Sequence, residues 1–160
     1  MSASPPWETY TEAAALELLG GNVDALRFVQ DISHWTHFYD DLIDRDKPVS
    51  DAAVHENMWR LVVSIPTNAF FRAHQDVLRP VIVTGILNWQ AANDIEREGS
   101  VEELRIAHTL RYSIADVLLL CMTLTCGREA AMKNARRARL MCQNDTWANY
   151  SSEHLVKDAT

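Results

Sequence analysis

The stretch that decides the fold is GGNVDALRFVQDISHWTHFYDDLIDR, residues 20–45, because it contains a complete helix together with its signals for starting and stopping. Gly20 and Gly21 are expected to end the helix that precedes them, and Asn22 or Asp24 can cap the new helix. On a helical wheel of about 100° per residue, the large apolar residues gather on one side. They are Phe28, Ile32, Trp35, Phe38, Tyr39 and Leu42. The stretch therefore predicts a long amphipathic helix that ends near Arg45.

Outward from this helix, the chain also reads as helices separated by turn-forming residues. Ser50 is a good N-cap, and the segment SIPTN, residues 64–68, predicts a turn. Pro80 suits the first position of a helix, and Ser100 with Glu103 forms a capping box. The predicted helices cover about 8–20, 22–45, 50–63, 69–78, 80–99, 100–127 and a basic segment from 128 onward.

The fold class follows from this row of helices. The 160 residues fit one domain that is large enough for a real core. The β-branched run RLVVSIP, residues 60–66, is short and continues a helical pattern from Met58, so we expect no strand. We predict an all-α protein, an irregular bundle of about six or seven helices. A single helical domain is expected over residues 1–142, with a C-terminal arm over 143–160.

Charge and composition limit the kinds of partner. The net charge of −7 disfavours nucleic acid, although the basic segment 128–139 could contact an acidic partner locally. No apolar run approaches the ~20 residues of a membrane-spanning helix, and MSASPPWETY lacks the pattern of a secretory signal. The three cysteines match no disulfide or zinc spacing. We therefore expect reduced thiols, no membrane and a cytoplasmic location.

The residue 20–45 helix also has an acidic side, nearly opposite its apolar stripe. Asp40, Asp41 and Asp44 lie there, with His37 one turn earlier. Carboxylates three or four residues apart are neighbours on a helix, and Mg²⁺ or Mn²⁺ prefers carboxylate oxygen. With His37, the same acids could instead hold zinc, manganese or iron. The alternative is an ordinary solvated helix face.

The predicted helix at 80–99 carries a second polar cluster. Gln90, Asn93, Asp94 and Arg97 fall on one face, which is either the floor of a pocket or a helix end that emerges into water. If this face meets the acidic side of the residue 20–45 helix, Asp94 would join the metal ligands. A molecule bound at this metal site would then be contacted by His37, Gln90, Asn93 and Arg97. A diphosphate would also need basic residues, for which the candidates are Arg45, Arg97, Arg105 and Arg111.

These two motifs resemble those of isoprenoid diphosphate synthases, which are all-α, magnesium-dependent enzymes. Asp40, Asp41 and Asp44 match the family's first motif, D-D-x-x-D. The segment GILNWQAANDIER, residues 85–97, is similar to the second motif, but Asn93 and Arg97 stand where that family has aspartates. The chain is also shorter than is usual for the family. The resemblance implies, as an alternative function, metal-dependent binding or turnover of a diphosphate ligand. All-α nucleotide pyrophosphohydrolases use two paired-acid motifs on helices. Asp41 and Asp44 loosely match the first of these motifs, and no convincing second motif follows at a suitable distance.

A broader resemblance spans most of the chain. The segments DDLIDRDKPVSD (40–51), SIPTNAFF (64–71) and LNWQAANDIER (87–97), in this order, are similar to small helical proteins of tailed bacteriophages. This resemblance implies a phage or prophage origin, and with it a location in the host cytoplasm or on a virion. It brings no assigned activity.

The five tryptophans are the last informative feature. Trp35, Trp59 and Trp89 fall within predicted helices and are expected in the core. Trp7 and Trp147 lie in the terminal segments, where they either pin those segments to the body or anchor an interface. The sequence contains no complete catalytic set, and whether the chain is an enzyme stays open. We predict an accessory or assembly protein that acts through protein contacts, with a protein partner or as a homo-oligomer.

Overall fold

The computed structural model describes residues 5–45 and 47–155, and every regular element in these ranges is a helix. The all-α prediction is therefore confirmed. The predicted count of six or seven helices was wrong, because the described residues form five helices of ten residues or more. Four of them are α2 (Val23–Asp44), α5 (Ala69–Glu98), α6 (Val101–Leu110) and α7 (Ile114–Cys142). The fifth is a continuous helix made of α3 (Asp51–Trp59), η1 (Arg60–Ser64) and α4 (Ile65–Thr67). The shorter α1 (Glu12–Leu18) and α8 (Trp147–Leu155) complete the chain.

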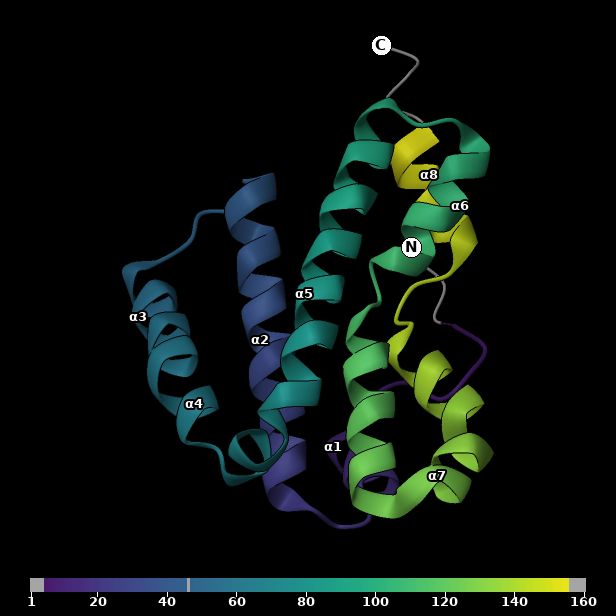
Figure 1. Cartoon of the computed structure of the whole chain (residues 1–160). Helices are drawn as coiled ribbons and strands as arrows, with labels where there is room; N and C mark the ends of the chain where they lie inside the picture. The colour runs from purple at the N-terminus through teal and green to yellow at the C-terminus, as the bar shows by residue number, and fades with distance from the viewer. Residues whose placement is uncertain (1–4, 46, 156–160) are drawn as a thin grey trace.

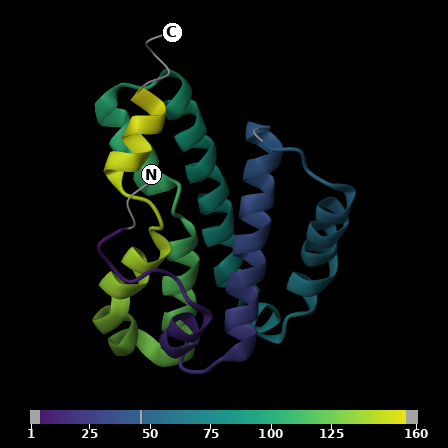
Figure 2. The ribbon, with the colours of Figure 1, turned by 180° about the vertical axis from the view of Figure 1, so that it is seen from behind.

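Helices α2 and α5 lie side by side at the centre of the molecule (Figure 1). The α3–η1–α4 helix stands on the outer side of α2, and α7 stands on the other side with α1 near its lower end. The short helices α6 and α8 pack together beside the C-terminal half of α5, and the view from behind agrees (Figure 2). This arrangement brings the ends of α2 and α5 close to the α6–α7 turn.

The buried residues form two separate clusters. The larger cluster joins α1, α2, the start of α5 and α7 around Phe28, whose ring stacks on that of Phe71 at 5.3 Å. The smaller cluster joins the end of α5 to α6 and α8 through Ala92, Leu104, Ala107 and Tyr150. The predicted C-terminal arm thus packs against the body, because Trp147 and Tyr150 contribute to this smaller cluster.

The ends of α2 match the sequence prediction. The Asn22 side chain accepts a hydrogen bond from the backbone N–H of Ala25, and Arg45 ends the helix in the left-handed region, at φ 55°. Leu26, which falls on the polar side of the predicted wheel, is buried. The N-terminal half of α2 is enclosed by α1, α5 and α7, so apolar residues are buried on more than one side of it.

Two predicted boundaries around α5 were wrong. The expected break at Pro80 is absent, because α5 runs as one helix of 30 residues through it. A proline inside a helix costs roughly 3 kcal/mol, and burial of apolar side chains on both sides of Pro80, such as Leu78 before it and Ala92 after it, offsets this cost. The predicted turn at 64–68 is also helical up to Thr67. Pro66 lies in the last turn of this continuous helix, directly after the π-helical turn η1.

The predicted helix 100–127 is correct at its start and its end but is interrupted inside. Ser100 and Glu103 form the expected capping box, and Gly127 breaks the helix path at φ 80° and ψ 170°. A turn at 111–113 separates α6 from α7. An apolar window within Val101–His154, with a mean hydropathy of 1.4, is long and apolar enough to cross a membrane by composition alone. The same stretch includes the turn and the Gly127 break, and it contributes core residues such as Leu118.

The basic segment 128–139 forms the second arm of α7, and part of its charge is balanced within the chain. Arg137 donates hydrogen bonds to both Glu8 and Glu17, which ties the N-terminal segment and α1 to this arm. Arg139 pairs with Asp116 of the first arm. All three cysteines are free, and burial raises the pKa of the Cys121 thiol to about 12.

We expect Gly127→Ala to lower the free energy of unfolding by about 1–3 kcal/mol, because this backbone conformation is accessible almost only to glycine. Gly85→Ala is the matched control. Its added Cβ would meet Ser113 Cβ at 3.6 Å, an ordinary contact, so the gain in helix propensity should raise stability by roughly 0.5–1 kcal/mol. Chemical denaturation of both variants measures the difference. Equal effects would contradict a strained corner at Gly127.

Candidate functional site

The acidic side of α2 ends at a polar junction built around Arg111, which lies in the turn between α6 and α7. The Arg111 guanidinium donates to Asp40 Oδ1 at 2.7 Å and to Glu96 Oε1 at 2.8 Å, and its second terminal nitrogen also binds Glu96. Asp44 completes the set, with its carboxylate 4.0 Å from the same guanidinium. One arginine therefore joins the C-terminal end of α2 to the end of α5. We call these four residues, together with Tyr150 of α8, whose hydroxyl binds Glu96, the Arg111 junction.

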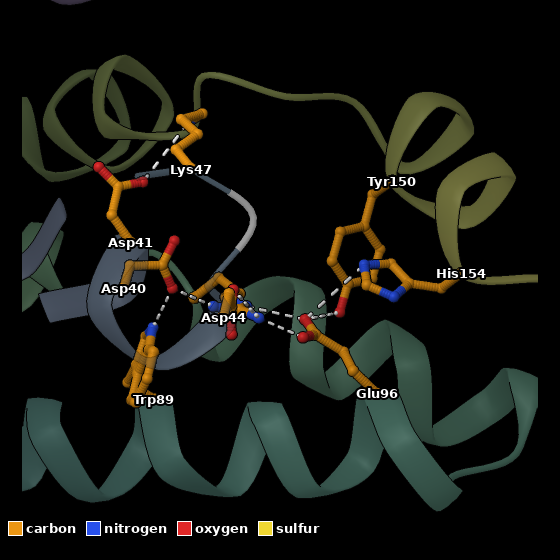
Figure 3. A network of polar contacts seen from close by, with 9 residues as sticks. Asp40, Asp41, Asp44, Lys47, Trp89, Glu96, Tyr150 and His154 are labelled. Atoms are coloured by element: carbon orange, nitrogen blue, oxygen red, sulfur yellow. Dashed lines mark hydrogen bonds and ion pairs between the residues drawn. The ribbon is translucent and has the colours of Figure 1, made fainter. Parts of the chain in front are cut away.

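Helix α8 reaches the Arg111 junction through two side chains. The Tyr150 hydroxyl donates to Glu96 Oε1, and His154 Nε2 lies 4.0 Å from the same oxygen. Figure 3 shows Tyr150 and His154 converging on Glu96 from one side, while Asp40 faces Trp89 on the other. Four segments that are distant in the sequence thus meet at one group of charges.

Burial makes these contacts energetically important. Only 7% of the Glu96 side chain and 18% of the Arg111 side chain are exposed. Burial by itself would raise the pKa of Glu96, but the hydrogen bonds from Arg111 and Tyr150 outweigh it, so this pKa lies below the ordinary 4.5. Burial and the bond to Glu96 both raise the pKa of Tyr150. Glu96 is therefore the anionic centre of the junction, and Tyr150 is a neutral donor to it.

Aromatic rings cover the α2 side of the junction. Trp89 Nε1 donates to Asp40 Oδ1 at 2.8 Å, and the Arg111 guanidinium lies 5.6 Å from the centre of the Trp89 ring. Tyr39 of α2 packs against Trp89, and Trp35 stacks on Tyr39 at 5.4 Å. Trp35 and Trp89 are half-buried and lie outside both buried clusters, so the expectation that they belong to the core is wrong.

A second candidate surface lies on the α3–η1 helix, where the usual arrangement of polar and apolar sides is reversed. The less exposed side carries polar groups among apolar ones: Asn57 is buried and Arg60 forms an ion pair with Asp31 of α2 at 3.4 Å, while Ala53 and Val63 are half-buried. The opposite side is apolar and exposed, with Trp59 at 64% and Val62 at 65% exposure. We call this surface the outer face of α3–η1. Its exposed apolar residues are Val54, Met58, Trp59, Leu61 and Val62.

The exposure of Trp59 corrects the expectation that it lies in the core. The sequence shows only that Trp59 falls within a helix. The ion pair between Arg60 and Asp31 fixes which side of that helix faces α2, and Trp59 lies on the other side.

Comparison with protein-family models, with curated proteins and with solved structures finds no match. The function of this chain is therefore inferred from the chemistry of its two candidate surfaces.

The four predicted metal ligands do not gather around one point. Asp40 and Asp44 contact Arg111, Asp41 forms an ion pair with Lys47 at 3.4 Å, and Asp94 forms one with Arg97 at 3.2 Å. Figure 3 shows Asp41 turned toward Lys47, away from Asp40's contact with Trp89. Across residues 5–45 and 47–155, no three His, Cys, Asp or Glu side chains are grouped so that they could hold a metal ion. The prediction of a Mg²⁺ or Mn²⁺ site thus has no grouped ligand set in the described part of the chain.

The predicted ligand-binding residues also separate. Gln90 and Arg97 are exposed and both donate to Asp94, so this part of the α5 face emerges into water. His37 is exposed, with its Nδ1 2.7 Å from the carbonyl oxygen of Ser33. Asn93, by contrast, is only 3% exposed. The predicted polar face is therefore divided between solvent and the interior.

Two important residues of the junction were missed from the sequence. Glu96 lies seven positions after Trp89, two helical turns away on the same side of α5, and this spacing was a usable signal. Tyr150 offered none, because it is 54 positions from Glu96. Arg111 was one of four basic candidates, and only the fold distinguishes it from Arg45, Arg97 and Arg105.

The predicted interface residues Trp7 and Trp147 are half-buried within the chain. Trp7 Nε1 donates to the carbonyl oxygen of Gln143 at 2.8 Å, so it ties the N-terminal segment to the end of α7. Trp147 packs against His108 and lies under Arg105, whose guanidinium is 4.6 Å from its ring centre. Both residues act as internal anchors in this structure, and an interface role for them stays a prediction.

Replacement of two buried asparagines by alanine should have different effects on the stability of the fold. Asn57 Nδ2 donates to the Ala53 carbonyl oxygen, whereas neither polar atom of the Asn93 side chain has a hydrogen-bond partner among the described residues. We expect Asn57→Ala to cost about 1–2 kcal/mol and Asn93→Ala to be neutral within about 0.5 kcal/mol or stabilising. Urea denaturation measures both. A loss for Asn93→Ala as large as that for Asn57→Ala would show that its amide is satisfied in solution.

Proposed function

We propose that this chain is an accessory or assembly protein that acts by binding protein through the outer face of α3–η1. The observation that carries the proposal is the reversed polarity of this helix, which directs Asn57 and Arg60 inward and Met58, Trp59 and Val62 outward. Contiguous apolar surface on a folded protein commonly marks a binding site, and tryptophan is enriched among the residues that dominate interface energies. The phage-type origin implied by the sequence resemblance is compatible with this role and stays a prediction.

The Arg111 junction has a supporting role in this proposal. Asp40 and Glu96 each accept hydrogen bonds from Arg111, so these carboxylates hold α2, α5 and the α6–α7 turn together. Because α8 is attached through Tyr150 at the same point, the junction makes the body of the molecule a rigid support for α3–η1. A rigid support reduces the conformational entropy that is lost on binding.

Photo-crosslinking tests the proposal. A photoreactive phenylalanine analogue is placed at Val62 in the full chain, which is produced in bacterial cells and irradiated. Met132 on α7 is the matched control site, because its exposure of 66% is close to the 65% of Val62. We expect a discrete covalent protein adduct from position 62 and none from position 132. The proposal fails if position 62 gives no adduct, or if both positions give the same adducts.

A further inference from the structure

We propose that the occupant of the outer face of α3–η1 is a second copy of this chain, bound in an antiparallel, two-fold symmetric pair of α3–η1 helices. This inference rests on the proposed function and names the partner for the same surface.

The charge distribution along this helix favours a like partner. After Asp51 at its first position, the helix carries two further charged side chains, Glu56 and Arg60, which form an ion pair with each other. The chain as a whole has a net charge of −7, so two copies repel each other over most of their surfaces. The outer face is a region where this repulsion is small. A strongly acidic or basic partner, by contrast, would find no opposite charge to pair with here.

The spacing of the apolar residues suits helix pairing. Val54, Met58 and Val62 recur every four residues, with Trp59 and Leu61 beside them, so they form a stripe along one side of the helix. A two-fold axis near Met58 brings Val54 of one copy opposite Val62 of the other and places apolar surface against apolar surface. In this arrangement Trp59 is buried twice, once from each copy. The continuous helix 51–67 is about 25 Å long, so the contact can extend over several turns.

The other exposed features fit a second copy less well. Met132 is surrounded on α7 by exposed Arg128, Lys133 and Arg136 with one exposed acid, Glu129, so a symmetric contact there would bring a net excess of positive charge together. A groove of about 520 Å³ between α2 and η1–α4 is lined by Arg27 and Arg60, which are already paired with Asp24 and Asp31. Val83 and Leu87 on α5 form a smaller apolar pair.

Sedimentation velocity of the purified full chain, from about 1 to 200 µM, tests the pairing. We expect a concentration-dependent dimer in the wild type. Trp59→Asp should weaken association by roughly a hundred-fold or more, because each dimer would then bury two uncompensated charges in place of two tryptophans. Met132→Asp is the control, with similar exposure on another surface, and should dimerise like the wild type. Since Trp59 is exposed, both variants should keep the wild-type circular dichroism spectrum.

A disulfide crosslink tests the register without relying on a destabilising change. Met58→Cys near the proposed axis should form a covalent dimer under mild oxidation, and Met132→Cys should not. A wild type that stays monomeric up to 200 µM would overturn the pairing. A dimer that is unaffected by Trp59→Asp, or that fails to crosslink through Met58→Cys, would also overturn it.

The two proposals fail in different ways. A monomeric chain that still forms an adduct from position 62 with a protein of another mass would refute the self-pairing and leave the proposed function intact. No adduct from position 62 would refute both. An adduct with the mass of two 18.2 kDa chains would support both.

Discussion

Replacement of Arg111 by methionine should lower the free energy of unfolding by about 3–5 kcal/mol, because removing one partner of a buried ion pair leaves the other uncompensated. The affected partner is Glu96, whose side chain is almost fully buried and which receives two hydrogen bonds from Arg111. Asp40 would lose its ion pair as well and keep only the bond from Trp89 Nε1. For a chain of this length, the melting temperature should fall by on the order of 10 °C.

The pH dependence identifies Glu96 as the cause. The pKa of Glu96 in the folded protein lies below the ordinary value of 4.5, so its contribution to stability is complete above about pH 4.5 and is lost as the pH falls below that value. The stability difference between the wild type and Arg111→Met should therefore shrink as the pH is lowered below about 4.5. Melting curves between pH 7 and pH 3 measure this change.

Two further variants complete the test. The double variant Arg111→Met with Glu96→Gln removes the buried charge together with its partner, and it should recover most of the lost stability. Arg97→Met breaks an exposed ion pair with Asp94 on the same helix and should change stability by less than about 0.5 kcal/mol. If Arg111→Met melts like Arg97→Met, the junction does not hold the helices together.

Replacement of Tyr150 by alanine should cost about 3–5 kcal/mol, as is typical for deleting a large buried aromatic side chain. Tyr150 is 6% exposed, its ring lies 4.7 Å from that of His108, and its hydroxyl binds Glu96. The loss should detach α8 from α6, so residues 143–155 should become more susceptible to limited proteolysis. Tyr150→Phe removes only the hydroxyl and should cost about 1.5–3 kcal/mol, the range for a hydrogen bond to a charged group.

Ser152→Ala, on the exposed side of α8, is the control and should leave stability within about 0.5 kcal/mol of the wild type. Denaturant unfolding and limited proteolysis are measured on all three variants. A Tyr150→Ala variant as stable and as protease-resistant as the wild type would contradict the role of Tyr150 in attaching the C-terminal segment to the body.

Sequence reasoning found part of the candidate site and could not assemble it. It identified Asp40 and Asp44 as an acidic cluster and Arg111 as one of several basic candidates. The pairing of Asp40 with Arg111 spans 71 positions, and helical periodicity relates residues only within a few turns of each other. Because the sequence does not locate the arginine that contacts it, the acidic cluster is equally consistent with metal ligands and with a solvated helix face.

The helices and several of their ends were determined by the sequence itself, because their signals are local. Asn22 caps α2, Ser100 and Glu103 form the capping box of α6, and Gly127 breaks α7, each through bonds or backbone angles within a few residues.

The tertiary structure alone decided which polar groups meet and which apolar groups remain exposed. Burial against other helices carries α5 through Pro80, the fold brings Arg111 between Asp40 and Glu96, and the ion pair between Arg60 and Asp31 turns Trp59 outward. The physical reason is that packing energy depends on neighbours distant in the chain, and at these places it outweighs the local preferences that a sequence displays.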